Sequence, residues 1–177
     1  MRHILIILGI CLAAIAIGAG LYFFGPKEFQ QVPAIGNVGA SAVGADVAED
    51  ISFRVLAEGQ NAAIPERKNY AVYTEEDFAA LWTRAYGEEA PALPAVNFAD
   101  SYVIGVFAGE QATGGHAIAV SRITDENAAR TVAITLTRPG AGCMVSQALT
   151  SPFQFVLVPF SDRALARVDE VLEAPCP

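Results

Sequence analysis

The sequence predicts an α+β domain, mainly an antiparallel β-sheet or open barrel with one amphipathic helix, preceded by an N-terminal transmembrane helix. Three observations carry this prediction. Residues 4–24 contain no charged side chain, and residues 74–85 show apolar side chains at helical spacing. The later segments are short, rich in β-branched residues and separated by Gly, Pro, Asn and Asp, with no βαβ alternation, which is typical of neighbouring antiparallel strands.

The first element is a 21-residue uncharged run, Ile4 to Phe24, which is long enough to span a membrane as a helix. A cleaved signal peptide remains the alternative, because Ala14-Ile15-Ala16 has the small-x-small form of a cleavage site. Arg2 precedes the run, so the positive-inside rule places the N-terminus in the cytoplasm. We therefore expect a single-pass protein of the bacterial inner membrane, with its C-terminal domain in the periplasm or outside the cell.

Composition divides the chain into an anchor at residues 1–25, a flexible linker at residues 26–50 and an exported domain at residues 51–177. The linker is rich in Gly, Ala, Val and Ser, and the domain is long enough to bury a core. The whole chain carries 19 acidic against 11 basic residues, a formal net charge of −8. Nucleic acid and anionic lipid headgroups are therefore not expected as partners, because both would be repelled.

Within the exported domain, the expected helix begins after Thr74, a good N-cap that is followed by three acidic residues in the first turn. Gly87 ends it. Four apolar residues recur at helical spacing and are expected to face the core: Phe78, Leu81, Trp82 and Ala85. A loop with two prolines follows at residues 88–97. The strands are expected at residues 51–56, 69–73, 102–107, 117–123, 132–137, 145–149 and 153–158, and residues 167–172 form either a last strand or a short helix.

The most informative segment joins the strands expected at residues 102–107 and 117–123. Its centre, Thr113-Gly114-Gly115-His116, has two adjacent glycines that supply the positive φ values of a tight turn. We expect a β-hairpin that presents these residues at a polar tip. Farther along, Asp125-Glu126-Asn127 lacks the pattern of a calcium-binding loop and is interpreted as a solvated hairpin turn.

Cys143 and Cys176 are the two cysteines outside the apolar run, an even number in a compartment where disulfides persist. We predict a disulfide between them, because the Pro-Cys-Pro tail at residues 175–177 has little else to hold it. Two unrelated thiols remain the alternative.

Catalytic chemistry finds little support in the sequence. His116 is the one histidine outside the N-terminal region, and Cys143 or Ser146 could pair with it as nucleophile and base. No Gly-x-Ser-x-Gly elbow is present, however, and Cys143 is better explained by its disulfide. No phosphate-binding loop or metal-ligand spacing occurs either. We expect no enzyme activity, no cofactor and no metal, and keep an enzyme that uses His116 as an alternative.

The order of several motifs between residues 98 and 158 resembles the PrcB C-terminal domain family. These motifs are the Val-Ile-Gly-Val-Phe segment from Val103, the Thr-Gly-Gly turn, Arg138-Pro139-Gly140 and the Gln-x-x-Thr-x-Pro segment from Gln147. The family takes its name from a subunit of a bacterial surface protease complex. The resemblance implies an exported, tethered, non-catalytic module that supports or regulates a protease or another envelope protein. Ala112 and His116 depart from the family pattern around the glycines.

A second likeness concerns the Thr-Gly-containing loop alone, which is similar to the cleft-binding loop of chagasin-type cysteine protease inhibitors. It implies a protease inhibitor that acts through the Thr113-Gly114-Gly115 loop, whose glycines would let the backbone approach a cleft closely. The candidate binding residues belong to this loop: Gln111, Thr113, Gly114, Gly115 and His116.

Overall fold

The computed structural model describes residues 27–29 and 48–176. The predicted anchor and most of the predicted linker lie outside these residues, and among the described residues no helix is long and apolar enough to cross a membrane. The elements are β1 (Lys27–Glu28), β2 (Glu49–Asp50), β3 (Arg54–Gly59), β4 (Lys68–Val72), α2 (Glu75–Tyr86), the 3₁₀ turn η1 (Gly87–Glu89), β5 (Ser101–Phe107), β6 (Ala117–Glu126), β7 (Ala129–Pro139), β8 (Phe153–Pro159) and β9 (Ala164–Ala174).

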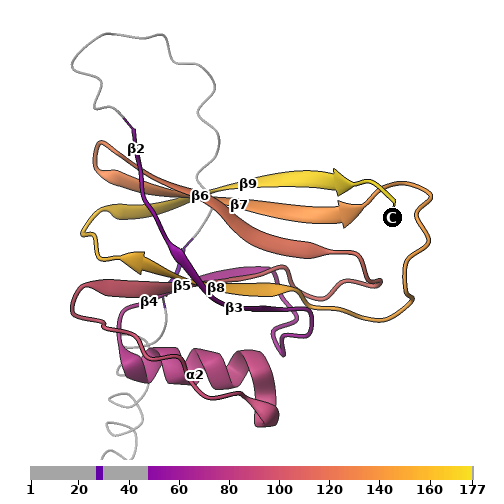
Figure 1. Ribbon diagram of the computed structural model, residues 1–177, viewed down its shortest axis with the longest axis horizontal. Helices are drawn as coiled ribbons and strands as arrows, with labels where there is room; N and C mark the ends of the chain where they lie inside the picture. The colour runs from indigo at the N-terminus through magenta and orange to yellow at the C-terminus, as the bar shows by residue number, and fades with distance from the viewer. Residues whose placement is uncertain (1–26, 30–47, 177) are drawn as a thin grey trace, which may run out of the picture.

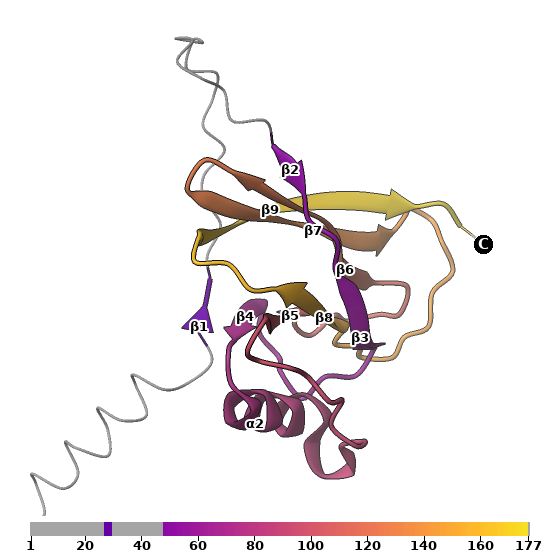
Figure 2. The ribbon, with the colours of Figure 1, turned by 60° about the vertical axis from the view of Figure 1, so that its left-hand side comes forward.

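The described chain forms three layers: two β-sheets face each other, and α2 covers the outer side of one of them (Figures 1 and 2). The first sheet has the strand order β1-β4-β5-β8-β3, and the second has the order β2-β6-β7-β9. The mainly antiparallel sheet is thus confirmed, as two separate sheets rather than a barrel. Residues 27–28 and 49–50, within the predicted linker, pair with β4 and β6.

Most of the expected strands are present, with differences at both ends of the domain. The first begins at Arg54, three residues later than expected. The last segment is strand β9, not a helix. It runs parallel to β7, whereas the other strand pairs of the described residues are antiparallel. A parallel partner is possible because the chain crosses through β8 in the other sheet before it returns.

The central strand β5 builds both cores, because alternate side chains point to opposite faces of a strand. Tyr102, Ile104 and Val106 are buried between the two sheets. Val103 and Phe107 are buried against α2. Each fully buried side chain of this kind contributes about 1.5–3 kcal/mol, so a strand that is buried on both sides fixes the positions of both outer layers.

Helix α2 forms as its sequence predicts. The Thr74 side chain accepts a hydrogen bond from the Asp77 backbone N–H at 3.1 Å, and Gly87 ends the helix with φ of 72°. The expected apolar face is confirmed, since Phe78, Leu81, Trp82 and Ala85 are the buried residues of the helix.

Replacing Thr74 with alanine should therefore lower the free energy of unfolding by about 1 kcal/mol, because the first helical turn loses its side-chain acceptor. Chemical denaturation of the purified protein measures the change. Thr83→Ala, on the exposed side of the same helix, is the control and should change stability by less. Equal effects of the two substitutions would contradict the capping role.

A buried ion pair ties the two sheets together at the end of the β6–β7 hairpin. Arg130 donates two hydrogen bonds to Asp125, at 2.7 and 2.8 Å, and its guanidinium also reaches the Pro159 carbonyl on β8. Arg130 is 3% exposed and Asp125 is 9% exposed. The solvated hairpin turn expected at residues 125–127 is present, and Glu126 and Asn127 are exposed. Including Asp125 in it was wrong, because its place on β6 points it into the protein toward this arginine.

Candidate binding site at the loop end

The segment around Thr113 to His116 connects the two sheets instead of closing a hairpin. It leaves β5, which pairs with β4 and β8, and enters β6, which pairs with β2 and β7. The predicted hairpin was therefore wrong. A glycine-containing connection between two β-type segments looks the same in sequence whether the strands pair with each other or belong to different sheets.

Backbone hydrogen bonds attach this loop to the segment that precedes β8. Gln111 and Thr150 exchange both of their backbone bonds, at 2.7 and 3.0 Å, and the Thr150 hydroxyl donates to the Thr113 carbonyl at 3.0 Å. The Gly114 N–H donates to the Ser146 carbonyl at 2.9 Å. The loop is consequently a fixed part of the sandwich end and not a free tip.

The glycines of this loop are needed for different reasons, either for a positive φ or for a close contact. Gly115 has φ of 84°, in the region that favours glycine, whereas Gly114 is buried against the Ser146 side chain. Gly109, which sequence reasoning did not single out, has φ of 77°, and a Cβ there would lie 2.8 Å from the Arg67 backbone nitrogen. Gly109 thus combines a left-handed conformation with a close backbone approach.

Replacing Gly109 with alanine should lower the free energy of unfolding by about 2 kcal/mol, since the residue would be strained and the backbone of residues 65–67 would have to move. Gly114→Ala should cost less, because its nearest neighbour is the end of a serine side chain that can rotate. Thermal unfolding of both variants tests the order. A larger loss for Gly114→Ala would show that the loop is packed differently.

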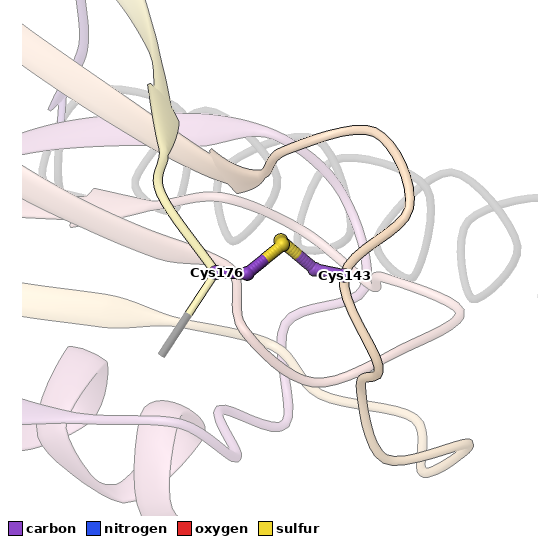
Figure 3. The surroundings of a disulfide bond; sticks show 2 residues. All are labelled: Cys143 and Cys176. Carbon is purple, nitrogen blue, oxygen red and sulfur yellow. A yellow bond between two sulfur atoms is a disulfide. The ribbon is translucent and has the colours of Figure 1, made fainter.

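Residues 140–149 form an irregular segment where a strand was expected at residues 145–149. That expectation was wrong, because these residues pair with none of the described strands, and the adjacent Thr150 makes an isolated bridge to Gln111. The segment is held at its other end by the predicted disulfide, which joins Cys143 to Cys176 just after β9 (Figure 3). Gly140 adds a backbone bond to the Ala174 carbonyl at 3.0 Å.

Two large apolar side chains of this segment face solvent. Met144 is 97% exposed and Leu149 is 65% exposed. A hollow of about 280 Å³ opens beside Met144. Its lining is mostly apolar and consists of Gly115, Pro139, Cys143, Met144, Val145, Ser146, Ala174 and Pro175. We call Met144, Leu149 and this hollow the loop-end surface.

Two of the other predicted residues, Gln111 and His116, lie at a second, smaller hollow. Gln111 and His116 line a space of about 160 Å³ between the sheets, together with Leu136 and Val171. The His116 ring nitrogen Nε2 lies 3.4 Å from the Thr113 hydroxyl. The five candidate residues thus belong to one end of the sandwich, where Gly115 borders one hollow, Gln111 and His116 border the other, and Gly114 is buried.

Sequence reasoning missed Met144 and Leu149. Met144 follows a cysteine in a Gly-rich stretch, and Leu149 lies in a segment that was interpreted as a strand, so neither apolar side chain indicated an exposed position. The signal that was available is Cys143 itself, because a disulfide can hold an irregular segment that has no strand partner. Across residues 27–29 and 48–176, no three His, Cys, Asp or Glu side chains gather as metal ligands would.

Comparison with known proteins gives one family. Residues 102–159 match the model of the PrcB C-terminal family, which confirms the resemblance seen in the sequence. The match begins in β5 and ends in β8, so it contains the loop at Thr113 and the segment with Met144 and Leu149. No curated protein and no solved structure matches the chain.

Proposed function

We propose that this chain, whose residues 102–159 match the PrcB C-terminal family, is a non-catalytic, membrane-tethered extracytoplasmic module that binds and supports or regulates a protease or another envelope protein. The observation that carries the proposal is the exposure of Met144 and Leu149 on a segment that is fixed in place. Side chains that are held in position lose little entropy when a partner covers them, which favours binding.

The fixing contacts come from both sides of the segment. The disulfide to Cys176 holds the part near Met144, and the paired backbone bonds between Gln111 and Thr150 hold the part next to Leu149. Exposed apolar side chains are typical of protein–protein contact sites, and a hollow lies beside Met144. The surface also belongs mostly to the segment that matches the family.

The proposed location rests on the sequence and on the disulfide. The uncharged run at residues 4–24 suits a membrane anchor. A disulfide between Cys143 and Cys176 suits a compartment outside the cytoplasm, where such bonds persist. A tethered domain needs only modest affinity for another envelope protein, because tethering raises the effective concentration of the two.

The alternatives receive less support from the geometry. An inhibitor loop would have to project its backbone into a cleft, but Gly114 is buried and its N–H is bonded to Ser146. An enzyme that uses His116 with Cys143 as nucleophile would need a free thiol, but Cys143 is bonded to Cys176. We place the partner contact at Met144 and Leu149 instead.

The double substitution Met144→Asp with Leu149→Asp tests this contact. It should weaken recovery of the partner by about 30-fold or more, because two apolar side chains at the centre of an interface contribute about 2 kcal/mol or more. The measurement is quantitative pull-down of envelope proteins by the full chain after mild crosslinking. Both side chains are exposed, so the variant should keep the wild-type melting temperature.

The matched control carries two aspartates at exposed positions of α2, as Thr83→Asp and Ala80→Asp. It has the same change in charge and should recover the partner as well as the wild type does. Equal loss in both double variants would mean that charge, and not the loop-end surface, decides binding. Undiminished recovery by the Met144 and Leu149 variant would contradict the proposal.

A further inference from the structure

Besides the ion pair of Arg130 and Asp125, another cluster of polar side chains lies between the sheets. Arg67 precedes β4, and its Nη2 atom donates to both carboxylate oxygens of Asp169 on β9, at 3.1 and 3.2 Å. Its Nη1 atom donates to the side-chain oxygen of Asn69 and to the Phe107 carbonyl. Arg167 on β9 reaches the same Asp169 at 3.4 Å. We call Arg67, Asn69, Arg167 and Asp169 the Arg67 cluster.

This cluster has more hydrogen-bond donors than acceptors. Within the described residues, three buried side-chain nitrogens lack any hydrogen-bond partner: Nε of Arg67, Nε of Arg167 and Nδ2 of Asn69. All three are donors, and all three belong to the Arg67 cluster. Asn69 is only 1% exposed. Buried donors without an acceptor are rare in proteins, because each has lost its hydrogen bond to water.

The Arg67 cluster also has more positive than negative charges. Two guanidinium groups face one carboxylate, which leaves one uncompensated positive charge. Burial lowers the pKa of Arg67, the nearby Asp169 counteracts this, and the charge of Arg167 lowers the pKa further. Lys68 belongs to the opposite face of β4, which it shares with Tyr70, and pairs there with Glu66 and Glu28.

We propose that the Arg67 cluster binds one small oxyanion, a carboxylate or an inorganic anion of similar size, through the free donors of Arg67, Arg167 and Asn69. One negative charge balances the cluster, and oxygen lone pairs accept hydrogen bonds from the three unpartnered nitrogens. Asp169 accepts from Nη2 of Arg67, while the Asn69 side-chain oxygen and the Phe107 carbonyl accept from Nη1. These bonds orient the guanidinium, so that the Nε–H remains for the anion. The ligand is either free in solution or an acidic group of a polypeptide.

Nuclear magnetic resonance of the full chain in neutral detergent tests the proposal, because each arginine Nε–H gives its own signal. At constant ionic strength, sodium acetate should shift the signals of Arg67, Arg167 and the Asn69 amide along one saturable curve. Arg122, exposed in its pair with Asp50, is the internal control and should not follow that curve. Absence of a saturable shift, or an equal shift of Arg122, would overturn the proposal.

Competition experiments with other ligands identify the source of the anion. A capped tripeptide with one glutamate should compete with acetate if the ligand belongs to a polypeptide, whereas its glutamine counterpart should not. Competition by inorganic phosphate and not by the glutamate peptide would assign the site to a free anion. Both results support the site, and failure of all three ligands overturns it while leaving the partner contact at Met144 and Leu149 unaffected.

Two substitutions should change the acetate affinity in opposite directions. Arg167→Gln removes a charged donor and should weaken acetate binding at least about tenfold. Asp169→Asn removes the internal negative charge and should tighten it. Arg122→Gln, with the same loss of charge at an exposed site, should leave the affinity unchanged. A merely structural cluster would show no tightening in Asp169→Asn, so weakening in both cluster variants would contradict the assignment.

Discussion

Replacing Asp125 with alanine is expected to lower the free energy of unfolding by about 3–5 kcal/mol, a large part of the stability of a domain of this size. The substitution leaves the guanidinium of Arg130, which is 3% exposed, without its carboxylate partner. Arg163 also loses its ion pair with Asp125, at 3.3 Å. Denaturant unfolding followed by circular dichroism measures the change.

Two further variants test whether the unpaired charge of Arg130, and not substitution in general, causes the loss of stability. Asp50→Ala removes the exposed ion pair with Arg122 and should cost no more than about 1 kcal/mol. Asp125→Leu combined with Arg130→Met removes both charges and should recover most of the loss. A double variant as unstable as Asp125→Ala would contradict the view that an unpaired buried charge causes the effect.

The same ion pair predicts a dependence of stability on pH. Hydrogen bonds from Arg130 lower the pKa of Asp125 below the ordinary value, and burial only partly opposes this. A carboxyl group whose pKa is lower in the folded state contributes stability above its unfolded pKa, about 3.9, and loses it as pH falls through the folded value. The stability difference between wild type and Asp125→Asn should therefore shrink below about pH 4.

Loss of the disulfide is the second large effect. Replacing Cys143 and Cys176 with serine should lower the free energy of unfolding by about 3–4 kcal/mol, because the unfolded chain is freed of a crosslink between residues 33 apart. The bond also holds the irregular segment at residues 140–149 next to β9, because this segment pairs with none of the described strands. Denaturant unfolding of the wild type with and without reductant should show the same difference.

The control for this prediction is the serine variant itself, whose unfolding midpoint should not respond to reductant. A wild-type midpoint that is also unaffected by reductant would show that the bond is not formed in the protein. Intact mass before and after alkylation of free thiols distinguishes this case. An oxidised wild-type protein with unchanged stability on reduction would contradict the stabilising role.

Elements with local causes could be predicted from the sequence. Helix α2 depends on the cap at Thr74 and on apolar residues three and four apart, all of which lie within one short stretch. The central strands could be recognised as well, since Tyr102 to Phe107 is a continuous apolar run bounded by polar and small residues, as expected for a strand buried on both faces. The disulfide followed from the number of cysteines and their context.

Features that depend on distant partners could not be predicted. The loop at Thr113 crosses between sheets because β5 pairs with β4 and β8, a pairing that no local pattern specifies. Asp125 is buried because Arg130 comes opposite it across the hairpin. For the candidate site, the five loop residues were brought to one end of the sandwich, but the exposure of Met144 and Leu149 follows from contacts made elsewhere in the chain.

Photo-crosslinking in intact bacteria tests the central claim most directly. A photoreactive phenylalanine analogue in place of Met144, on the loop-end surface, should give a crosslinked product that contains a protease or another envelope protein. The same analogue in place of Thr83, exposed on α2, should give no such product. The analogue is also placed at Leu149. Absence of a crosslinked product with the analogue at Met144 and at Leu149, or an equal product with the analogue at Thr83, would contradict the loop-end surface as the site of partner binding.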